Sequence, residues 1–154
     1  RTLLFIGLNP STATNVEDDQ TMRRLLGFCN SWHYGRLVVI NLFAWISKTP
    51  AELKICSDPV GFANDRQISK WLKKWSEKPN WDLWLGWGGN GALLNRNFEV
   101  LKLIEGYSFY RFQCFPQAFG PMAMGITNHG HPRHPLYLSA KEVLYPFLWG
   151  IDEL

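Results

Sequence analysis

Short apolar runs that end in turn-forming residues alternate along this chain with stretches of helical periodicity. Four of these runs predict buried strands, at residues 3–8, 37–40, 81–87 and 107–115. Alternation of strands with helices is typical of a parallel sheet, because each connection between parallel strands must cross a face of the sheet. The sequence therefore predicts an α/β fold, a three-layer α/β/α sandwich around a short, mainly parallel, four-stranded sheet.

The stretches between and after these runs predict helices. Apolar residues recur every three or four positions over 22–32, and a longer amphipathic helix is expected over 62–77. Capping-box patterns at 49–52 and 139–142 predict a short helix and a closing helix that runs through Leu148. The helix after the third strand should end at Gly106, which suits a C-cap, and residues 116–135 are expected to form an irregular loop.

Length and composition limit the class of protein. The 154 residues suit one domain, and 46% hydrophobic residues with eight tryptophans provide the material for a dense core. No apolar run approaches the roughly 20 residues that span a bilayer, and no signal-peptide pattern opens the chain. We therefore expect a single domain over residues 1–154, without a membrane partner and located in the cytoplasm.

The cysteines and the net charge do not indicate a particular metal, cofactor or partner. Cys29, Cys56 and Cys114 are an odd set without a close pair, which fits neither a disulfide framework nor a zinc or iron–sulfur site. Reduced thiols are expected, with no metal and no cofactor. The net charge of +3 permits a nucleic-acid partner without arguing for one, since no block of consecutive Lys or Arg forms an electrostatic footprint.

Polar and turn-forming residues gather where the predicted strands end. They are Gly7-Leu8-Asn9-Pro10-Ser11 after the first strand, Asn41 at the end of the second, Trp87-Gly88-Gly89-Asn90 after the third, and Gly130-His131-Pro132-Arg133-His134-Pro135 after the fourth. In open α/β sheets the ligand crevice lies beyond the carboxyl ends of the strands, so all four motifs are expected to face one pocket. The alternative for any single motif is an ordinary turn.

These motifs resemble those of the uracil-DNA glycosylase superfamily. Gly7-Leu8-Asn9-Pro10 is similar to the motif whose asparagine positions the attacking water, and Val38-Val39-Ile40-Asn41 resembles the strand whose last asparagine reads the flipped base. Leu85-Gly86-Trp87-Gly88, with Ala92, resembles the third-strand segment of the uracil-specific branch. His131-Pro132-Arg133-His134-Pro135-Leu136 resembles the motif that supplies an electrophilic histidine and a duplex-wedging leucine. The resemblance implies that superfamily's fold and a DNA glycosylase activity.

The chain departs from that pattern in two ways. The fourth motif holds one residue more than the usual spacing, so either His131 or His134 takes the histidine role, and the cysteines of the iron–sulfur branches are absent. The combination of Gly-Leu-Asn-Pro-Ser-Thr-Ala, Asn-Leu-Phe-Ala and Gly-His-Pro-Arg-His-Pro-Leu-Tyr is more similar to a bacterial and phage family, the domain of unknown function 1643. That second resemblance implies no established activity.

The motif residues suit hydrolysis of an N-glycosidic bond, which requires an extruded base, a held water and stabilisation of the leaving base. The catalytic candidates are Asn9, which would hold the water, and His131 or His134, which would donate to the base. The base-binding candidates are Asn41 through its amide, Phe43 through stacking, and Leu8. The expected phosphate or DNA contacts are Ser11, Gly88, Gly89, Asn90, Arg133, Leu136 and Tyr137.

Each assignment has a structural alternative. Asn9 would cap or turn the backbone, and Phe43, Trp45 and Trp87 would belong to the core. The three histidines within 129–134 could bind a metal, but no Asp, Glu or Cys lies among them. Asp18 and Asp19 would complement a helix dipole or reach back to the pocket as a general base.

Two functions from different classes follow. The first is a base-recognising hydrolase, a DNA glycosylase-like protein that acts on a modified or mismatched base. The second is a non-catalytic nucleotide- or nucleic-acid-binding module of the same fold, since fold alone does not decide function. A weaker third option is a phosphoryl- or nucleotidyl-handling enzyme that uses residues 88–91, although this segment lacks the lysine of a P-loop.

Overall fold

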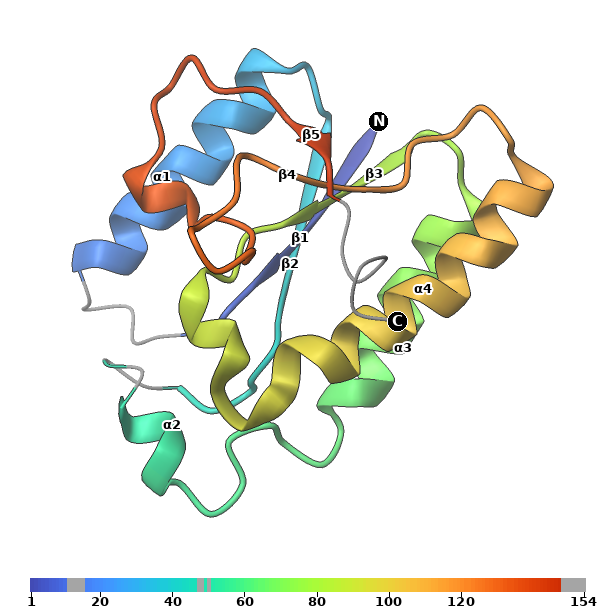
Figure 1. Cartoon of the computed structure of the whole chain (residues 1–154). Helices are drawn as coiled ribbons and strands as arrows, with labels where there is room; N and C mark the ends of the chain where they lie inside the picture. Colours follow the sequence, from blue (N-terminus) through green and yellow to red (C-terminus); the bar gives the residue numbers. More distant parts are fainter. Residues whose placement is uncertain (11–15, 47–48, 50, 148–154) are drawn as a thin grey trace.

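A five-stranded, mainly parallel sheet forms the centre of the molecule (Figure 1). The computed structural model describes residues 1–10, 16–46, 49 and 51–147. The strand order is β2-β1-β3-β4-β5, in which β1, β2, β3 and β4 are parallel and β5 is antiparallel to β4. The strands are β1 (Thr2–Gly7), β2 (Arg36–Asn41), β3 (Trp81–Leu85), β4 (Pro121–Ala123) and β5 (Tyr145–Pro146).

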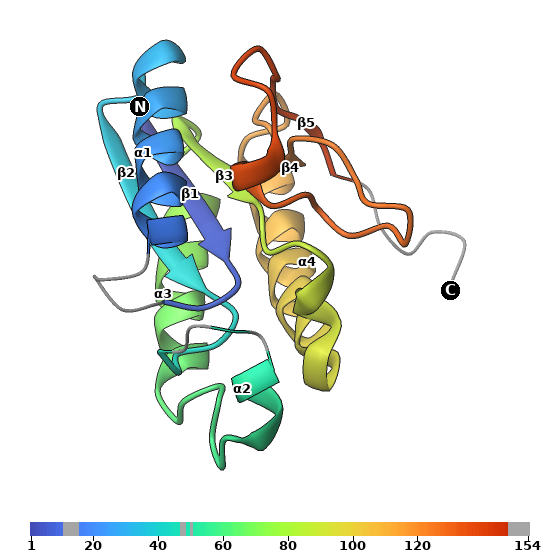
Figure 2. The same ribbon diagram turned by 90° about the vertical axis from the view of Figure 1, so that its left-hand side faces the viewer.

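Helices cover both faces of this sheet. They are α1 (Val16–Ser31), α2 (Ala51–Ile55), α3 (Asn64–Glu77) and α4 (Arg96–Cys114), with 3₁₀ turns η1 (Gly89–Asn95) and η2 (Pro135–Tyr137). Figure 2 shows α1 in front of β1 and β2, with α3 and α4 beyond the sheet. The α/β class, the mainly parallel sheet, its first three strands and the first three helices were predicted correctly. The proline of the predicted capping box, Pro50, lies outside the described residues.

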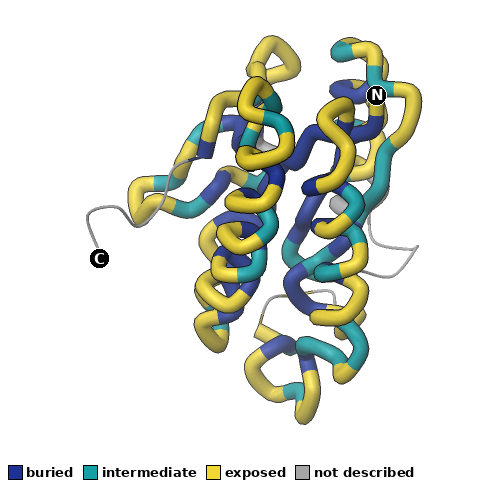
Figure 3. Tube along the Cα trace, turned by 90° about the vertical axis from the view of Figure 1, so that its right-hand side faces the viewer, coloured by how far each residue is buried: buried dark blue, intermediate teal, exposed yellow. Residues whose placement is uncertain are grey.

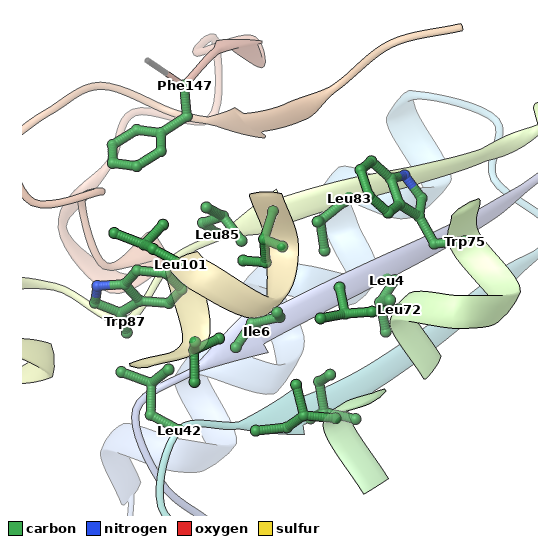
Figure 4. Packing of buried hydrophobic residues seen from close by; sticks show 14 of the residues in the cluster. Leu4, Ile6, Leu42, Leu72, Trp75, Leu83, Leu85, Trp87, Leu101 and Phe147 are labelled. Carbon is green, nitrogen blue, oxygen red and sulfur yellow. The ribbon is translucent and has the colours of Figure 1, made fainter. Parts of the chain in front are cut away.

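Two hydrophobic clusters fill the interfaces between the sheet and the helices on its two faces. Leu4 and Ile6 of β1 pack with Leu72 and Trp75 of α3 on one face, as Figure 4 shows. The neighbouring residues Leu3 and Phe5 point to the other face, because side chains alternate along a strand, and pack with α1. Figure 3, which faces α3 and α4, shows the outer turns of both helices exposed. β1 is buried throughout, as expected for a strand with neighbours on both sides.

The prediction of a strand over 107–115 is wrong, because α4 continues through this segment to Cys114. Its aromatic residues favour a strand by propensity, but Phe109 and Phe112 are exposed. The inward positions of the last turns are Ser108 and Arg111, and both are buried. The buried residues of this stripe are polar, so the apolar residues alone do not show the period of a helix. The count of four strands is wrong because this segment is not a strand and because β4 and β5 were not predicted.

The last part of the sheet was also missed. β4 and β5 are too short to show an alternating pattern, and β4 lies within the segment expected to be a loop. Ser139 does not open a helix. Its Oγ accepts from the Lys141 amide at 3.2 Å and its carbonyl accepts from the Glu142 amide at 3.1 Å, which closes a single turn. The chain then extends into β5, and Phe147 is buried in the core beside it.

The three cysteines are free, as predicted. Cys29 is buried in the cluster under α1, Cys56 is half-buried and Cys114 is exposed. Over the described part of the chain, no helix is long and apolar enough to cross a membrane.

Replacing Gly106 tests the corrected end of α4. Gly106 lies inside the helix, and a Cβ added there would meet no atom within 4 Å. Gly106→Ala should therefore raise the free energy of unfolding by about 0.5–1 kcal/mol, since alanine loses less backbone entropy in a helix. Urea denaturation measures the change. Gly125→Ala is the control with the opposite sign, because Gly125 has φ +84°. If Gly106→Ala instead destabilised the protein, the prediction that the helix ends at Gly106 would be supported.

The reactivity of the thiols should follow their burial. Burial raises the pKa of Cys29 to about 11. At pH 8 only about one Cys29 thiol in a thousand is then ionised, and the thiolate is the reactive form. A disulfide reagent should modify the exposed Cys114 quickly and leave Cys29 unmodified until the protein unfolds. Loss of the fast phase in Cys29→Ser, with Cys114 intact, would contradict this assignment.

Candidate functional site

The strand order places the crevice of this sheet between β1 and β3. After β1 the chain crosses to β2 on one side, and it later returns to β3 on the other side. In open α/β sheets ligands bind beyond the carboxyl ends of the strands at such a switch point. The two strand ends are held together here, since the Gly86 amide donates to the Ile6 carbonyl at 2.9 Å. We call this end of the sheet the carboxyl edge.

Asn41 brings an amide side chain to the carboxyl edge. It lies opposite Gly7 in the parallel pair of β1 and β2. A Cβ on Gly7 would come within 2.9 Å of Asn41 Oδ1, so the amide lies over the end of β1 on the face that α1 covers. Asn41 is half-buried, and its side chain has no hydrogen-bond partner among the described residues. An amide in this state offers one donor group and one acceptor to a ligand.

Long-range hydrogen bonds fix the backbone under this amide. Asn64 Nδ2, at the start of α3, donates to the Asn41 carbonyl at 3.1 Å and to the Leu42 carbonyl at 2.9 Å. Arg96 Nε, at the start of α4, donates to the same Leu42 carbonyl at 2.7 Å. The buried Arg96 guanidinium also pairs with Asp65 at 2.5 Å and Glu99 at 2.9 Å. Two helices therefore hold the end of β2 in place.

The predicted histidine loop packs against the glycine turn that follows β3. The Gly88 amide donates to the Pro132 carbonyl at 2.9 Å, and Gly88 has φ +72°, which favours glycine. A Cβ on Gly88 would lie 3.5 Å from the Cβ of His134, and one on Gly89 would lie 4.0 Å from Cδ2 of His131. The structure therefore brings the third and fourth sequence motifs together.

The two candidate histidines differ in how firmly their rings are held. His134 Nδ1 accepts a hydrogen bond from the Leu136 amide at 3.2 Å, at the start of η2. In the neutral ring the proton is then on Nε2, which makes that atom a donor. Within the described segments, the His131 side chain forms no hydrogen bond, and its backbone amide donates to Thr127 Oγ1. The geometry therefore fixes the tautomer of His134 only.

Asn9 follows β1 at the same edge, and its side chain is bound to backbone. Asn9 Nδ2 donates to the Pro10 carbonyl at 3.1 Å and to the Trp45 carbonyl at 3.2 Å. These contacts match the turn-forming alternative for Asn9. They also orient its amide group, because they hold the nitrogen toward the backbone and turn Oδ1 away from those two carbonyls.

The other predicted site residues differ in how far they are exposed. Phe43 has no exposed surface, and Phe43 and Trp87 belong to the core, which is their structural alternative. Leu8 packs partly buried against the same cluster. Asn90 and Arg133 are exposed, whereas Leu136 is half-buried. Ser11 and the Tyr137 side chain lie outside the described part of the structure, as do the side chains of Asp18 and Asp19.

Arg24 is a residue that the sequence analysis missed. Its Nε donates to the Pro135 carbonyl at 2.9 Å, which ties α1 to η2, and Figure 1 shows these two segments side by side. Its Nη2 is buried without a hydrogen-bond partner in the described structure. No sequence signal distinguishes Arg24 from other helix arginines, since its partner lies 111 residues away.

The side chains of the described residues form no group of three or more His, Cys, Asp or Glu that could hold a metal ion. The carboxyl edge thus offers amide, imidazole and guanidinium groups. Such groups recognise polar edges of ligands by hydrogen bonding, and an imidazole also donates or accepts protons.

Comparison with known proteins gives one match. The family described as "Protein of unknown function (DUF1643)" matches residues 1–136, which include all four motifs. No curated protein shows a significant similarity to the chain, and no solved structure does. The resemblance to the uracil-DNA glycosylase superfamily therefore stays a prediction.

Adding a side chain at Gly7 should disturb the packing at the carboxyl edge. A Cβ there would lie 2.9 Å from Asn41 Oδ1 and 3.0 Å from Phe5 Cε1. We expect Gly7→Ala to lower the free energy of unfolding by about 1–3 kcal/mol, the usual cost of overpacking. The control is Gly27→Ala in α1, where a Cβ meets no atom within 4 Å. Equal urea midpoints for Gly7→Ala and the wild type would show that the amide is not packed on Gly7.

Proposed function

The chain belongs to the DUF1643 family, and we propose that this member is a base-recognising hydrolase that cleaves the N-glycosidic bond of a modified or mismatched base in DNA. The observation that carries the proposal is the half-buried Asn41 amide, which lies over Gly7 at the edge that also holds His134. Gly86 lies beside the segments that carry these two groups, because its amide bonds to Ile6 of β1 and a Cβ added to it would lie 3.3 Å from Pro135 Cδ. An unpartnered amide at a switch point is a common means of reading a planar polar ligand.

Base recognition is assigned to Asn41. A pyrimidine edge presents adjacent donor and acceptor atoms, and one amide satisfies both at once. A buried base edge that loses its hydrogen-bond partner costs far more binding free energy than a lost apolar contact. Asn41 would therefore control which base is selected. The bonds from Asn64 and Arg96 support this role because they hold the backbone carbonyls of Asn41 and Leu42, and so fix the position of the main chain that carries the Asn41 side chain.

Stabilisation of the leaving base is assigned to His134. In hydrolysis the water oxygen bonds to the anomeric carbon, the carbon–nitrogen bond breaks, and its electron pair moves onto the base, which gains a proton overall as the attacking water loses one. A neutral imidazole with its proton on Nε2 would donate to the base oxygen as that charge develops. The backbone bond to Nδ1 supports His134 over His131 for this role, since it selects the required tautomer.

Positioning of the water is assigned to Asn9. The two bonds from Nδ2 orient its amide, and the carbonyl oxygen would accept a hydrogen bond from the attacking water. Gly88, Gly89 and Arg133 lie around the histidine loop and would contact phosphate. Arg24, beside η2, adds a buried guanidinium nitrogen on the same face.

The second candidate is a non-catalytic nucleotide- or nucleic-acid-binding module. The observation in its favour is that Asn9 Nδ2 donates to two backbone carbonyls, those of Pro10 and Trp45, which suits a residue that stabilises a turn. This module would keep base reading by Asn41 without hydrolysis.

Single substitutions separate these roles. Asn9→Ala should abolish base release and leave binding largely intact, because the water contributes mainly to the transition state. Asn41→Ala should weaken binding and relax selectivity. His134→Ala should lower the rate about 10²–10³-fold, as loss of one oxyanion donor does, and His131→Ala should cost less. The measurement is base release from single- and double-stranded oligonucleotides that carry uracil, thymine mismatches or modified pyrimidines, with binding followed in parallel.

Two variants serve as controls. Asn80→Ala makes the same substitution at an exposed position before β3, and His129→Ala does so at an exposed position of the histidine loop. Both should retain wild-type rates. If the wild type binds the oligonucleotides and Asn41→Ala does not, but no base is released, the binding module replaces the hydrolase. If the wild type neither binds nor cleaves any substrate in this panel, both proposals are wrong.

A further inference from the structure

Two stacked tryptophans lie at the amino end of the sheet, on the side of α3. The rings of Trp71 in α3 and Trp81 in β3 have centroids 6.2 Å apart and planes 24° apart. Trp81 is 6% exposed and Trp71 is half-buried. In the strand register, Trp81 and Arg36 both lie opposite Thr2, so the starts of β2 and β3 form one row beneath this pair.

Four cations surround the two rings. Arg36 Cζ lies 5.6 Å from each ring centroid, and Lys70 Nζ and Lys74 Nζ lie 5.4 Å and 4.6 Å from the Trp71 centroid. Lys78 Nζ lies 5.9 Å from the Trp81 centroid. Cations within about 6 Å of an aromatic ring are attracted to its face, which holds them in position. We call these four residues, Arg36, Lys70, Lys74 and Lys78, the cation patch.

The charge of the cation patch is not neutralised locally. None of its four residues forms an ion pair with a described carboxylate, and the nearby Glu77 pairs instead with Lys73 at 2.5 Å. The whole chain carries a net charge of only +3, so this one surface concentrates more positive charge than the chain has in total. A concentrated patch of one sign attracts polyanions and raises their rate of association.

We propose that the cation patch binds the phosphate backbone of a nucleic acid. Lys70 and Lys74 lie about 6 Å apart along the axis of α3, and Lys78 is the extended residue that caps the end of this helix, so the three lysines span about 12 Å. A row of this length is longer than one phosphate group, so it suits a partner that carries several phosphates in line. Contacts of this kind are independent of base sequence and supply non-specific affinity.

The same surface is less suited to an anionic membrane. Proteins that bind membranes peripherally insert apolar side chains into the interface in addition to their cations. In the cation patch Trp81 is 6% exposed, and the half-buried Trp71 has Arg36, Lys70 and Lys74 within 6 Å of its ring. The patch therefore presents mainly charge.

The cation patch lies at the opposite end of the strands from the carboxyl edge. The six residues of β1 and β2 correspond to about 20 Å between the two ends. The proposal uses none of the residues assigned to base recognition or hydrolysis. It goes beyond the proposed function, because the patch would hold a nucleic acid even if the carboxyl edge catalysed no reaction.

The salt dependence of binding tests the proposal. The probe is an unmodified DNA duplex of about 20 base pairs with a fluorescent label, titrated with the full chain over a series of salt concentrations. The variant is Lys70→Ala with Lys74→Ala. The matched control is Lys73→Ala with Lys102→Ala, which removes the same charge from the groove between α3 and α4. We expect the patch variant to reduce the slope of log affinity against log salt by about 1.8, because each lost phosphate contact contributes about 0.9.

The outcomes separate this proposal from its alternatives. The control variant should keep the wild-type slope. Far-UV circular dichroism checks that each variant is folded. Equal slopes for the patch and control variants would overturn the proposal, as would absence of duplex binding by the wild type. Patch-dependent binding to phosphatidylserine vesicles without duplex binding would assign the surface to a membrane instead.

Discussion

The pairing of β1 with a parallel strand on each side is the constraint on which the other parts of the structure depend. All six residues of β1 are buried, and the strand shares its hydrogen bonds with β2 and β3 in one continuous register. A slip of one residue would turn Leu4 and Ile6 away from α3 and move Leu3 and Phe5 out of the cluster under α1. The register also aligns Gly7 with Asn41, so the same packing that stabilises the sheet positions the candidate site.

Buried arginines connect α4 to both ends of this sheet. At the start of the helix, Arg96 donates to the Leu42 carbonyl beyond β2. Near its end, Arg111 has no exposed surface and donates to carbonyls of Trp75, Lys78 and Trp81 at the end of α3 and the start of β3. Desolvation lowers the pKa of Arg111, and the three accepting carbonyls and the Trp75 ring, 4.6 Å away, offset that cost. These contacts explain why a segment rich in aromatic residues is helical.

Helix α3 links the two proposed functional surfaces. Asn64 at its start holds the backbone of Asn41 at the carboxyl edge, and Lys70 and Lys74 on its outer side belong to the cation patch. The division resembles a general feature of nucleic-acid recognition, in which phosphate contacts position the partner and base contacts select it. The two surfaces use different chemistry, charge at one end and directional hydrogen bonds at the other, so each can be removed without the other.

Local patterns were enough to predict β1, β2, β3 and α3, because their apolar residues follow the period of the element they form. They also placed Asn41 and the glycine turn at strand ends. Local patterns did not show that residues 107–114 continue α4, because this depends on tertiary structure. Arg111 can face the interior only because carbonyls far away in the sequence accept its hydrogen bonds. The contact of Arg24 with Pro135 and the approach of Arg36 to Trp71 and Trp81 are likewise tertiary. The turn at Ser139 and the orientation of the His134 ring depend instead on bonds to residues two or three positions away, which the apolar pattern does not show. Periodicity indicates which residues avoid water, whereas a buried or oriented polar group is explained only by its partner, and for Arg24, Arg96 and Arg111 that partner lies far away in the sequence.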